Sequence, residues 1–177
     1  MDFEDQHAID LLFVDECGFN LTPSIPYGWI PTGEQRTIRS AKSLVANALG
    51  FLNRVGKLKV YLTKSTIDSD FVISCIDEIA QSITKPTVLV MDNAPWHRSV
   101  KMKLRMEQWQ NQELYIFFLP TYSPHLNLIE ILWRKIKYEW LKPKDYLSVK
   151  NLYEALVKII KGYDNQFCIN FSKNFFK

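Results

Sequence analysis

The sequence contains few cysteines, no long apolar run and no basic residue near its start. Its three cysteines form no Cys-x-x-Cys pair, so the pattern supports neither a disulfide framework nor a zinc knuckle, and it fits a reducing compartment. No apolar stretch approaches the roughly 20 residues that a membrane helix requires, and the first residues lack the positive charge of a signal peptide. These absences predict a soluble, cytoplasmic protein.

Acidic and basic residues are distributed unevenly along the chain. The net charge is +3, from 22 Lys and Arg against 19 Asp and Glu. Residues 1–16 hold six of the acids and no Lys or Arg, so the remainder carries 22 basic and 13 acidic residues, a net charge of +9. A basic body with a local acidic cluster suits an enzyme that binds a polyanion and gathers carboxylates at a metal site. An acidic terminus without a function explains the same numbers equally well.

The hydrophobic pattern predicts one domain over residues 1–177. With 47% hydrophobic residues, the chain is long enough to bury a single core and too short for two comfortable domains. Apolar runs typical of strands occupy 8–16, 43–52, 57–64, 87–92 and 113–120. Helical spacing occurs in 66–83, 99–112, 127–141 and 148–163. This order predicts an α/β fold with a mixed central sheet and helices packed on it.

Three acids stand out by their positions. Asp15 and Asp92 each end a strand of the buried type, and Glu130 falls in the first turn of a predicted helix. Each has an ordinary structural explanation, since strand-end Asp residues often cap turns, and Asn127 followed by Glu130 resembles a capping box that starts the helix. Together they indicate more, because strand-end carboxylates on neighbouring strands converge at the sheet edge where open α/β sheets bind ligands.

Carboxylates gathered in this way repel one another unless a cation binds between them. Mg²⁺ prefers a site with few protein carboxylates and open positions for water and phosphate oxygens. Two such ions roughly 3.5 to 4 Å apart activate an attacking hydroxyl and stabilise the leaving oxygen in phosphodiester chemistry. Asp15, Asp92 and Glu130 are therefore the predicted catalytic and metal-binding residues, with two Mg²⁺ or Mn²⁺ ions as cofactors. A two-carboxylate glycosidase is the alternative, but it leaves the third acid and the basic helices unexplained.

Three segments around these acids carry a resemblance to a known family: VDECGF, VMDNAPWHRS and LPTYSPHLNLIEILW. They resemble the catalytic domain of DDE transposases of the mariner superfamily, particularly its bacterial branch, the insertion sequence 630 group. The resemblance implies a ribonuclease H-like fold that cleaves transposon ends and transfers the 3′-OH into target DNA. It places the catalytic acids on Asp15, Asp92 and Glu130. Leu128 departs from the pattern, because the family usually has Pro there, which predicts weaker helix initiation and an intact metal site.

Other residues have supporting roles in this hypothesis. Candidates for positions around the metal ligands are Glu16, Asn93, His97 and Asn127. The alternative for Glu16 is an ordinary solvated charge, and the alternative for Asn93 is a role in a turn. Candidate contacts to DNA phosphates are Arg98, Lys101, Lys103, Arg105, Arg134, Lys135 and Lys137. Ordinary solvated helix faces explain these cations as well.

The resemblance also implies partners besides DNA. Family members usually carry an N-terminal helix-turn-helix region that recognises transposon ends, and we expect it to be absent here, either encoded separately or lost. Because transposition pairs two ends, a homodimer is expected in the active complex, associated with the nucleoid in a bacterial cell. Two alternatives stay open: a domesticated or remnant DNA-binding protein without transposition activity, and another ribonuclease H-like endonuclease.

Overall fold

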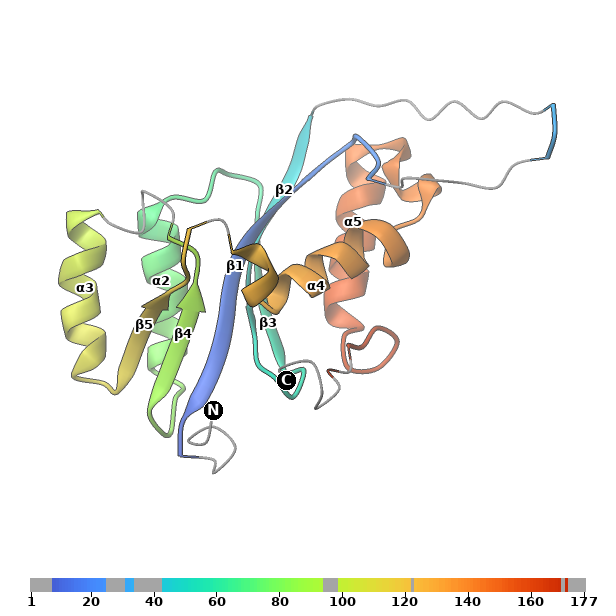
Figure 1. Ribbon diagram of the computed structural model, residues 1–177. Helices are drawn as coiled ribbons and strands as arrows, with labels where there is room; N and C mark the ends of the chain where they lie inside the picture. The colour runs from blue at the N-terminus through green and yellow to red at the C-terminus, as the bar shows by residue number, and fades with distance from the viewer. Residues whose placement is uncertain are drawn as a thin grey trace.

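The computed structural model describes residues 8–24, 31–33, 43–93, 99–121, 123–169 and 171. In these residues a five-stranded sheet carries helices on both faces (Figure 1). The strands are β1 (Asp10–Asn20), β2 (Leu44–Leu52), β3 (Leu58–Thr63), β4 (Thr87–Met91) and β5 (Leu114–Phe118). The α-helices are α2 (Ser69–Ala80), α3 (Val100–Gln110), α4 (Ile129–Lys135) and α5 (Val149–Lys161). The predicted order of elements and the α/β class are confirmed.

The sheet is mixed, as predicted, with the strand order β3-β2-β1-β4-β5. The pairs β1–β2 and β2–β3 are antiparallel, whereas β1–β4 and β4–β5 are parallel. Parallel neighbours need crossover connections, which are usually helical, and α3 provides the one between β4 and β5. β1 lies at the centre of the sheet, so its side chains have neighbours on both sides.

β1 is longer than the sequence indicated. The prediction that this strand ends at Asp15 and Glu16 was wrong, because β1 continues to Asn20. β2 supplies antiparallel partners from Phe13 to Asn20, whereas β4 pairs only with 10–13. Asp15 therefore lies inside a strand, just beyond the point where its parallel partner ends.

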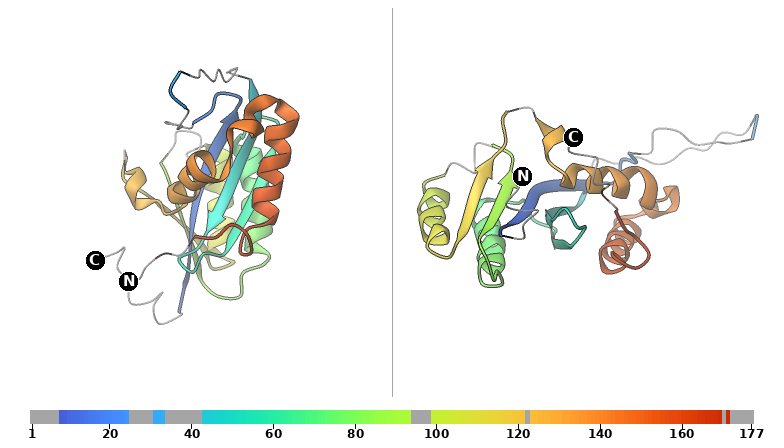
Figure 2. Two further views of the ribbon diagram at one scale, coloured as in Figure 1. Left: turned by 90° about the vertical axis from the view of Figure 1, so that its right-hand side faces the viewer. Right: turned by 60° about the horizontal axis from the view of Figure 1, so that its bottom comes forward.

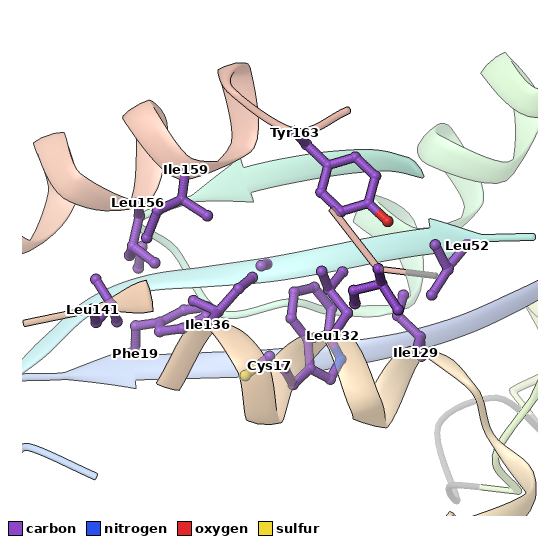
Figure 3. Packing of buried hydrophobic residues seen from close by; sticks show 14 of the residues in the cluster. Cys17, Phe19, Leu52, Ile129, Leu132, Ile136, Leu141, Leu156, Ile159 and Tyr163 are labelled. Carbon is purple, nitrogen blue, oxygen red and sulfur yellow. The ribbon is translucent and has the colours of Figure 1, made fainter. Parts of the chain in front are cut away.

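Side-chain alternation along the strands divides the core between the two faces of the sheet. Phe13, Cys17 and Phe19 of β1 pack with α4 and α5, while Val14 packs with α2 and α3. Figure 3 shows residues of α4 directed into the first of these clusters, and Figure 2 shows the helices from two other sides. The predicted buried stripe of the α4 segment is confirmed: Ile129, Leu132 and Ile136 are buried, and Trp140 packs against the cluster while partly exposed.

Local sequence sets the helix ends. Asp68, Ser99 and Ser148 each accept a backbone N–H from the first turn of α2, α3 and α5, respectively, which satisfies donors that the helix leaves free. α4 continues into a π-helical turn, η3 (Ile136–Trp140), and the predicted connector to α5 contains a 3₁₀ helix, η4 (Pro143–Leu147). The three cysteines are free thiols. No helix in the described part of the chain is long and apolar enough to cross a membrane.

Candidate active site

Strand alternation places Asp15 and Asp92 on the same face of the sheet. Phe13 and Cys17 flank Asp15 at two-residue spacing and face α4, so Asp15 faces α4 as well. Val90 belongs to that same face, and Asp92 follows it by two residues. The parallel register pairs Phe13 with Val90 and goes no further, so each acid lies two residues beyond the last pair of the β1–β4 ladder. Both acids thus lie at the same end of this ladder, although Asp15 is not at a strand end.

Glu130 reaches the same region from helix α4. It is the second residue of that helix, where the dipole of the first turn favours an acidic side chain. Burial, then the charge of Glu130, then that of Glu16 raise the pKa of Asp15 from 3.8 to about 8, and Asp92 adds a smaller contribution. Glu130 and Asp92 therefore both lie within electrostatic reach of Asp15.

Asn127 fastens the start of α4 to β1 instead of capping the helix with its side chain. The predicted capping role was wrong: its Nδ2 donates to the carbonyl of Val14 at 3.0 Å in a buried position, and only its backbone carbonyl accepts the N–H of Glu130, at 3.1 Å. Val14 is the first residue of β1 beyond its pairing with β4, and a buried carbonyl there requires a donor. The amide thereby fixes α4 beside the residue that precedes Asp15.

Leu128 occupies the position where the transposase family usually has proline. Its φ of −56° lies within the range that a proline ring imposes. Its side chain is buried against the core on this face of the sheet. The backbone at the start of α4 therefore has a proline-compatible conformation, and packing of the leucine supports it.

Trp133, which the sequence assigned only to packing, contacts Asp15 directly. Its indole Nε1 donates to Asp15 Oδ2 at 3.1 Å, and its ring meets Phe19 edge to face with centroids 6.4 Å apart. Gly50 of β2 pairs with Asp15, and a Cβ at Gly50 would come within 2.9 Å of the Trp133 ring. Sequence spacing could have indicated that Trp133 lies near the site, because Glu130 and Trp133 are three residues apart and share one side of the helix.

The other residues expected near the metal ligands have different placements. Glu16 projects to the opposite face from Asp15. It is two residues from Val14 in the strand and therefore shares the face of Val14, which packs with α2 and α3. Asn93 follows Asp92 and is half-buried. His97 and Arg98 lie outside the described residues.

Several of the predicted DNA-binding cations are held by carboxylates. Lys101 contacts Asp70 at 2.8 Å, and the Nε of Arg105 donates to Asp77 at 2.8 Å, which ties α3 to α2. Lys135 pairs with Glu139 one helical turn away, at 2.8 Å. Lys103 and Arg134 are exposed.

Lys137 differs from these cations because it forms no ion pair with a carboxylate of the described residues. Its Nζ lies 5.5 Å from the centroid of the Phe19 ring. It is also close to Cys17, whose pKa burial raises to about 11 while Lys137 opposes the shift. A cavity of about 40 Å³ adjoins it, lined by Gly18, Phe19, Asn20, Thr22, Ser24, Lys137 and Tyr146. Lys137 thus has no carboxylate partner among the described residues, and it lies beside a mainly polar cavity on the face that carries Asp15.

The face that carries the acids is open on the side of β5. Tyr115 and Phe117 pair with Val88 and Val90 and share their face of the sheet. No described helix covers them there, and they are 42% and 56% exposed. Asp92 is exposed as well. A large substrate can therefore approach the acids from this side.

The donor chemistry of the acids fits a divalent cation. Carboxylate oxygens are the ligands that Mg²⁺ prefers, and neither Asp15 nor Glu130 forms an ion pair with a Lys or Arg in the described ranges. Within those ranges, no three His, Cys, Asp or Glu side chains are arranged to hold a metal ion. This is compatible with the raised pKa of Asp15, because charges interact over longer distances than coordination bonds. Repulsion keeps like charges apart, and a cation would favour their approach.

Comparison with known proteins gives matches of three kinds: a family, a protein sequence and solved structures. Residues 10–153 match the family described as DDE superfamily endonuclease. The uncharacterized protein y4pE/y4sA of Sinorhizobium fredii is 31% identical over 84 residues, which cover 45% of this chain and 58% of that protein. The crystal structure of the Mos1 strand transfer complex is similar with a TM-score of 0.54 and 12% identity, covering 91% of this chain and 49% of that chain.

A second structure, the Mos1 mariner paired end complex with Mn, has a TM-score of 0.52 and 13% identity, covering 91% of this chain and 58% of that chain. The predicted ribonuclease H-like fold is confirmed by these likenesses. The chain spans only 49% to 58% of the length of these proteins.

Proposed function

Because the chain belongs to the family of DDE superfamily endonucleases, we propose that it is the catalytic domain of a DNA transposase. It cleaves transposon ends and joins the freed 3′-OH to target DNA, and its motifs are most similar to those of the insertion sequence 630 group. The observation that carries the proposal is the placement of Asp15 on the face of the sheet covered by α4, whose first turn holds Glu130. Burial first, and then the charges of Glu130, Glu16 and Asp92, raise the pKa of Asp15 to about 8.

Asp15, Asp92 and Glu130 hold two divalent cations, Mg²⁺ or Mn²⁺, in this proposal. Bound there, the cations supply activation of the attacking hydroxyl and stabilisation of the leaving oxygen. Asn127 keeps α4, and with it Glu130, in register with β1 through its 3.0 Å bond to Val14. Similar solved structures of Mos1 paired end complexes contain Mn or Mg, which supports a divalent cofactor.

Lys137 is a proposed DNA contact on the face of the sheet that carries Asp15. It follows Glu130 by seven residues, which is roughly 10 Å along the helix and about two turns, so both side chains lie on a similar side. Because no described carboxylate neutralises Lys137, its charge is available to a backbone phosphate, and the hydroxyl groups of Thr22, Ser24 and Tyr146 lie around the adjoining cavity. Arg134 and Lys103 are exposed and add contacts without sequence preference.

The active complex in this proposal contains two copies of the chain and a region that recognises the transposon ends. Strand transfer requires two transposon ends to be held together, which a symmetric dimer achieves with one catalytic site for each end. A helix-turn-helix region provides sequence recognition. A solved Mos1 transposase structure similar to this chain is described as a paired-end complex with the left transposon end, which supports this assembly.

The test of the proposed function uses supercoiled plasmid and a labelled oligonucleotide with a free 3′-OH, each incubated with the chain and Mn²⁺. The chain should nick the plasmid and join the oligonucleotide to it, because both steps use the same site. Asp92→Asn should reduce both products by orders of magnitude, since it removes a metal ligand. Glu154→Gln is the matched control, a change of an exposed acid on α5 that lies outside the proposed site, and it should leave both products unchanged.

The products also separate the proposal from its rivals. Nicked plasmid without joined oligonucleotide identifies an endonuclease that does not transfer strands. Salt-dependent DNA binding without any metal-stimulated product identifies a DNA-binding protein derived from a transposase. Wild-type product levels in Asp92→Asn show that the acids are not the metal ligands, and the proposal is then wrong.

A further inference from the structure

We infer that Trp133 is a positioning residue for the metal site, which fixes the Asp15 carboxylate through its indole N–H, and that Gly50 provides the space this requires. The inference rests on the proposed function, because it concerns how the chain prepares one of the proposed metal ligands. Three observations support it: the 3.1 Å bond from Trp133 Nε1 to Asp15 Oδ2, the burial of Trp133, and the close approach of its ring to Gly50.

The bond restricts how Asp15 can orient. Trp133 is 3% exposed, so its N–H needs a protein partner, and Asp15 provides the acceptor. With Oδ2 held from the helix, the carboxylate keeps one orientation before a cation arrives. Partners of this kind, which orient metal ligands, typically change metal affinity or activity by 10- to 100-fold when removed.

Gly50 couples this bond to the backbone of the sheet. In the β1–β2 register Gly50 lies opposite Asp15, so the ring that bonds Asp15 also covers the neighbouring strand. A Cβ at Gly50 would meet Ile129 at 2.7 Å and the Trp133 ring at 2.9 Å, distances that require the helix or the ring to move. Glycine in a strand interior often marks a close approach of another group. Here that group is the helix that carries Glu130.

The same helix offers a matched control for removing the N–H. Trp140 contacts the rings of Tyr163 and Phe167, with centroids 6.4 and 5.2 Å away, and belongs to no part of the proposed site. Trp133→Phe keeps an aromatic ring over Gly50 and beside Phe19 but removes the donor to Asp15. Trp140→Phe makes the identical chemical change elsewhere on the helix. A difference between the two variants therefore reports the bond to Asp15 and not the loss of an indole.

Mn²⁺ binding, measured from the electron paramagnetic resonance signal of free Mn²⁺, provides a readout that is independent of activity. Trp133→Phe should weaken Mn²⁺ binding by about 10- to 100-fold, and Trp140→Phe should leave it unchanged. The nicking rate of Trp133→Phe should recover at higher Mn²⁺ concentration, because the defect lies in metal affinity. Gly50→Ala should weaken Mn²⁺ binding as well, although it removes no hydrogen-bonding group.

The outcomes distinguish failure of this inference from failure of the proposed function. Mn²⁺ binding by Trp133→Phe with the affinity of the wild type overturns the inference and leaves the function standing. An equal loss of affinity in Trp133→Phe and Trp140→Phe also overturns it, because the effect would then be one of packing. A wild-type chain that binds no Mn²⁺ overturns the proposed function and the inference together.

Discussion

Two tryptophan–aspartate pairs connect helices to their neighbours in this protein. Trp109 of α3 donates its Nε1 to Asp77 of α2 at 2.7 Å, and Arg105 donates to the same carboxylate oxygen at 2.8 Å. Trp133 of α4 donates to Asp15 of β1 at 3.1 Å. The charged side chains that shift the pKa of Asp15 are all acids. In both pairs an indole N–H donates to a carboxylate. The pairs differ in the charged groups near that carboxylate, which are Arg105 for Asp77 and other acids for Asp15.

These neighbouring charged groups decide what each aspartate can do. Next to Asp77, the guanidinium of Arg105 offsets the negative charge, and the arrangement joins α2 to α3. Burial and neighbouring acids instead raise the pKa of Asp15 to about 8, so its ionised form is costly unless a cation binds. A strongly shifted pKa of this kind is typical of functional sites. The comparison shows that a buried hydrogen-bonded acid becomes a metal ligand candidate through what surrounds it.

Removing each aspartate should give the largest contrast between the two pairs. Asp15→Ala should reduce Mn²⁺-dependent nicking by orders of magnitude, because a metal ligand is lost. Asp77→Ala should preserve nicking per folded molecule and lower the free energy of unfolding by about 2 kcal/mol, since it removes hydrogen bonds to a charged group. Plasmid nicking and urea unfolding measure the two effects. Loss of nicking in a folded Asp77→Ala protein would contradict the division of roles.

The pH dependence of stability should differ between wild type and Asp15→Asn. Between pH 3.8 and about 8, Asp15 is ionised in the unfolded chain and protonated in the folded one. Without metal, the unfolded state therefore binds fewer protons, and the free energy of unfolding falls as pH rises through this window. Asp15→Asn lacks this contribution and should be the more stable protein in EDTA near pH 8.

Mg²⁺ should reverse this order near pH 8, because only the wild type gains stability from a ligand that binds the folded state. Urea unfolding at about pH 5 and about pH 8, with EDTA or with Mg²⁺, measures both effects. An Asp15→Asn protein that loses as much stability with pH as the wild type does would refute the raised pKa.

The parts of the site that the sequence predicted depend on local patterns. Apolar runs and helical spacing located the elements, and the motifs around Asp15, Asp92 and Glu130 identified the acids. The extension of β1 to Asn20 was missed because its partners come from β2, which follows a long connection. The length of a strand depends on such partners as well as on its own residues.

The contacts that hold the acids in place were missed for a similar reason, although Asn127 was among the candidates for positions around the metal ligands. Asn127 donates to a carbonyl 113 residues away in the chain, and its helix-start composition favoured the local capping alternative. Gly50 is one glycine in a strand, and only the packing of α4 connects it to Trp133. Sequence patterns propose reactive groups from local motifs, whereas the contacts that orient those groups arise from tertiary structure.

Trp109→Phe should be a smaller perturbation that sharpens the comparison of the two pairs. It removes the N–H that reaches Asp77 but leaves Arg105 in place, so we expect a loss of about 1 kcal/mol in the free energy of unfolding. Mn²⁺ affinity should not change, in contrast to Trp133→Phe. Urea unfolding and Mn²⁺ titration check both statements, and a Mn²⁺ defect in Trp109→Phe would place the α2–α3 contact in the metal site.

The smallest predicted effects concern the cations of the two helices. Lys101 of α3 pairs with Asp70 at an exposed position, where such pairs contribute roughly 0 to 1 kcal/mol and already neutralise the lysine. Lys137 has no such described partner, so it should release a counterion when it binds a phosphate. Lys137→Ala should therefore weaken DNA binding and reduce the slope of log affinity against log salt concentration by about 1, whereas Lys101→Ala should change neither noticeably. Fluorescence anisotropy at several salt concentrations measures both slopes.

Equal losses of DNA affinity in Lys137→Ala and Lys101→Ala would contradict this prediction. They would mean that Asp70 does not keep Lys101 from DNA, and that pairing with a carboxylate does not distinguish α3 from the helix that carries Lys137.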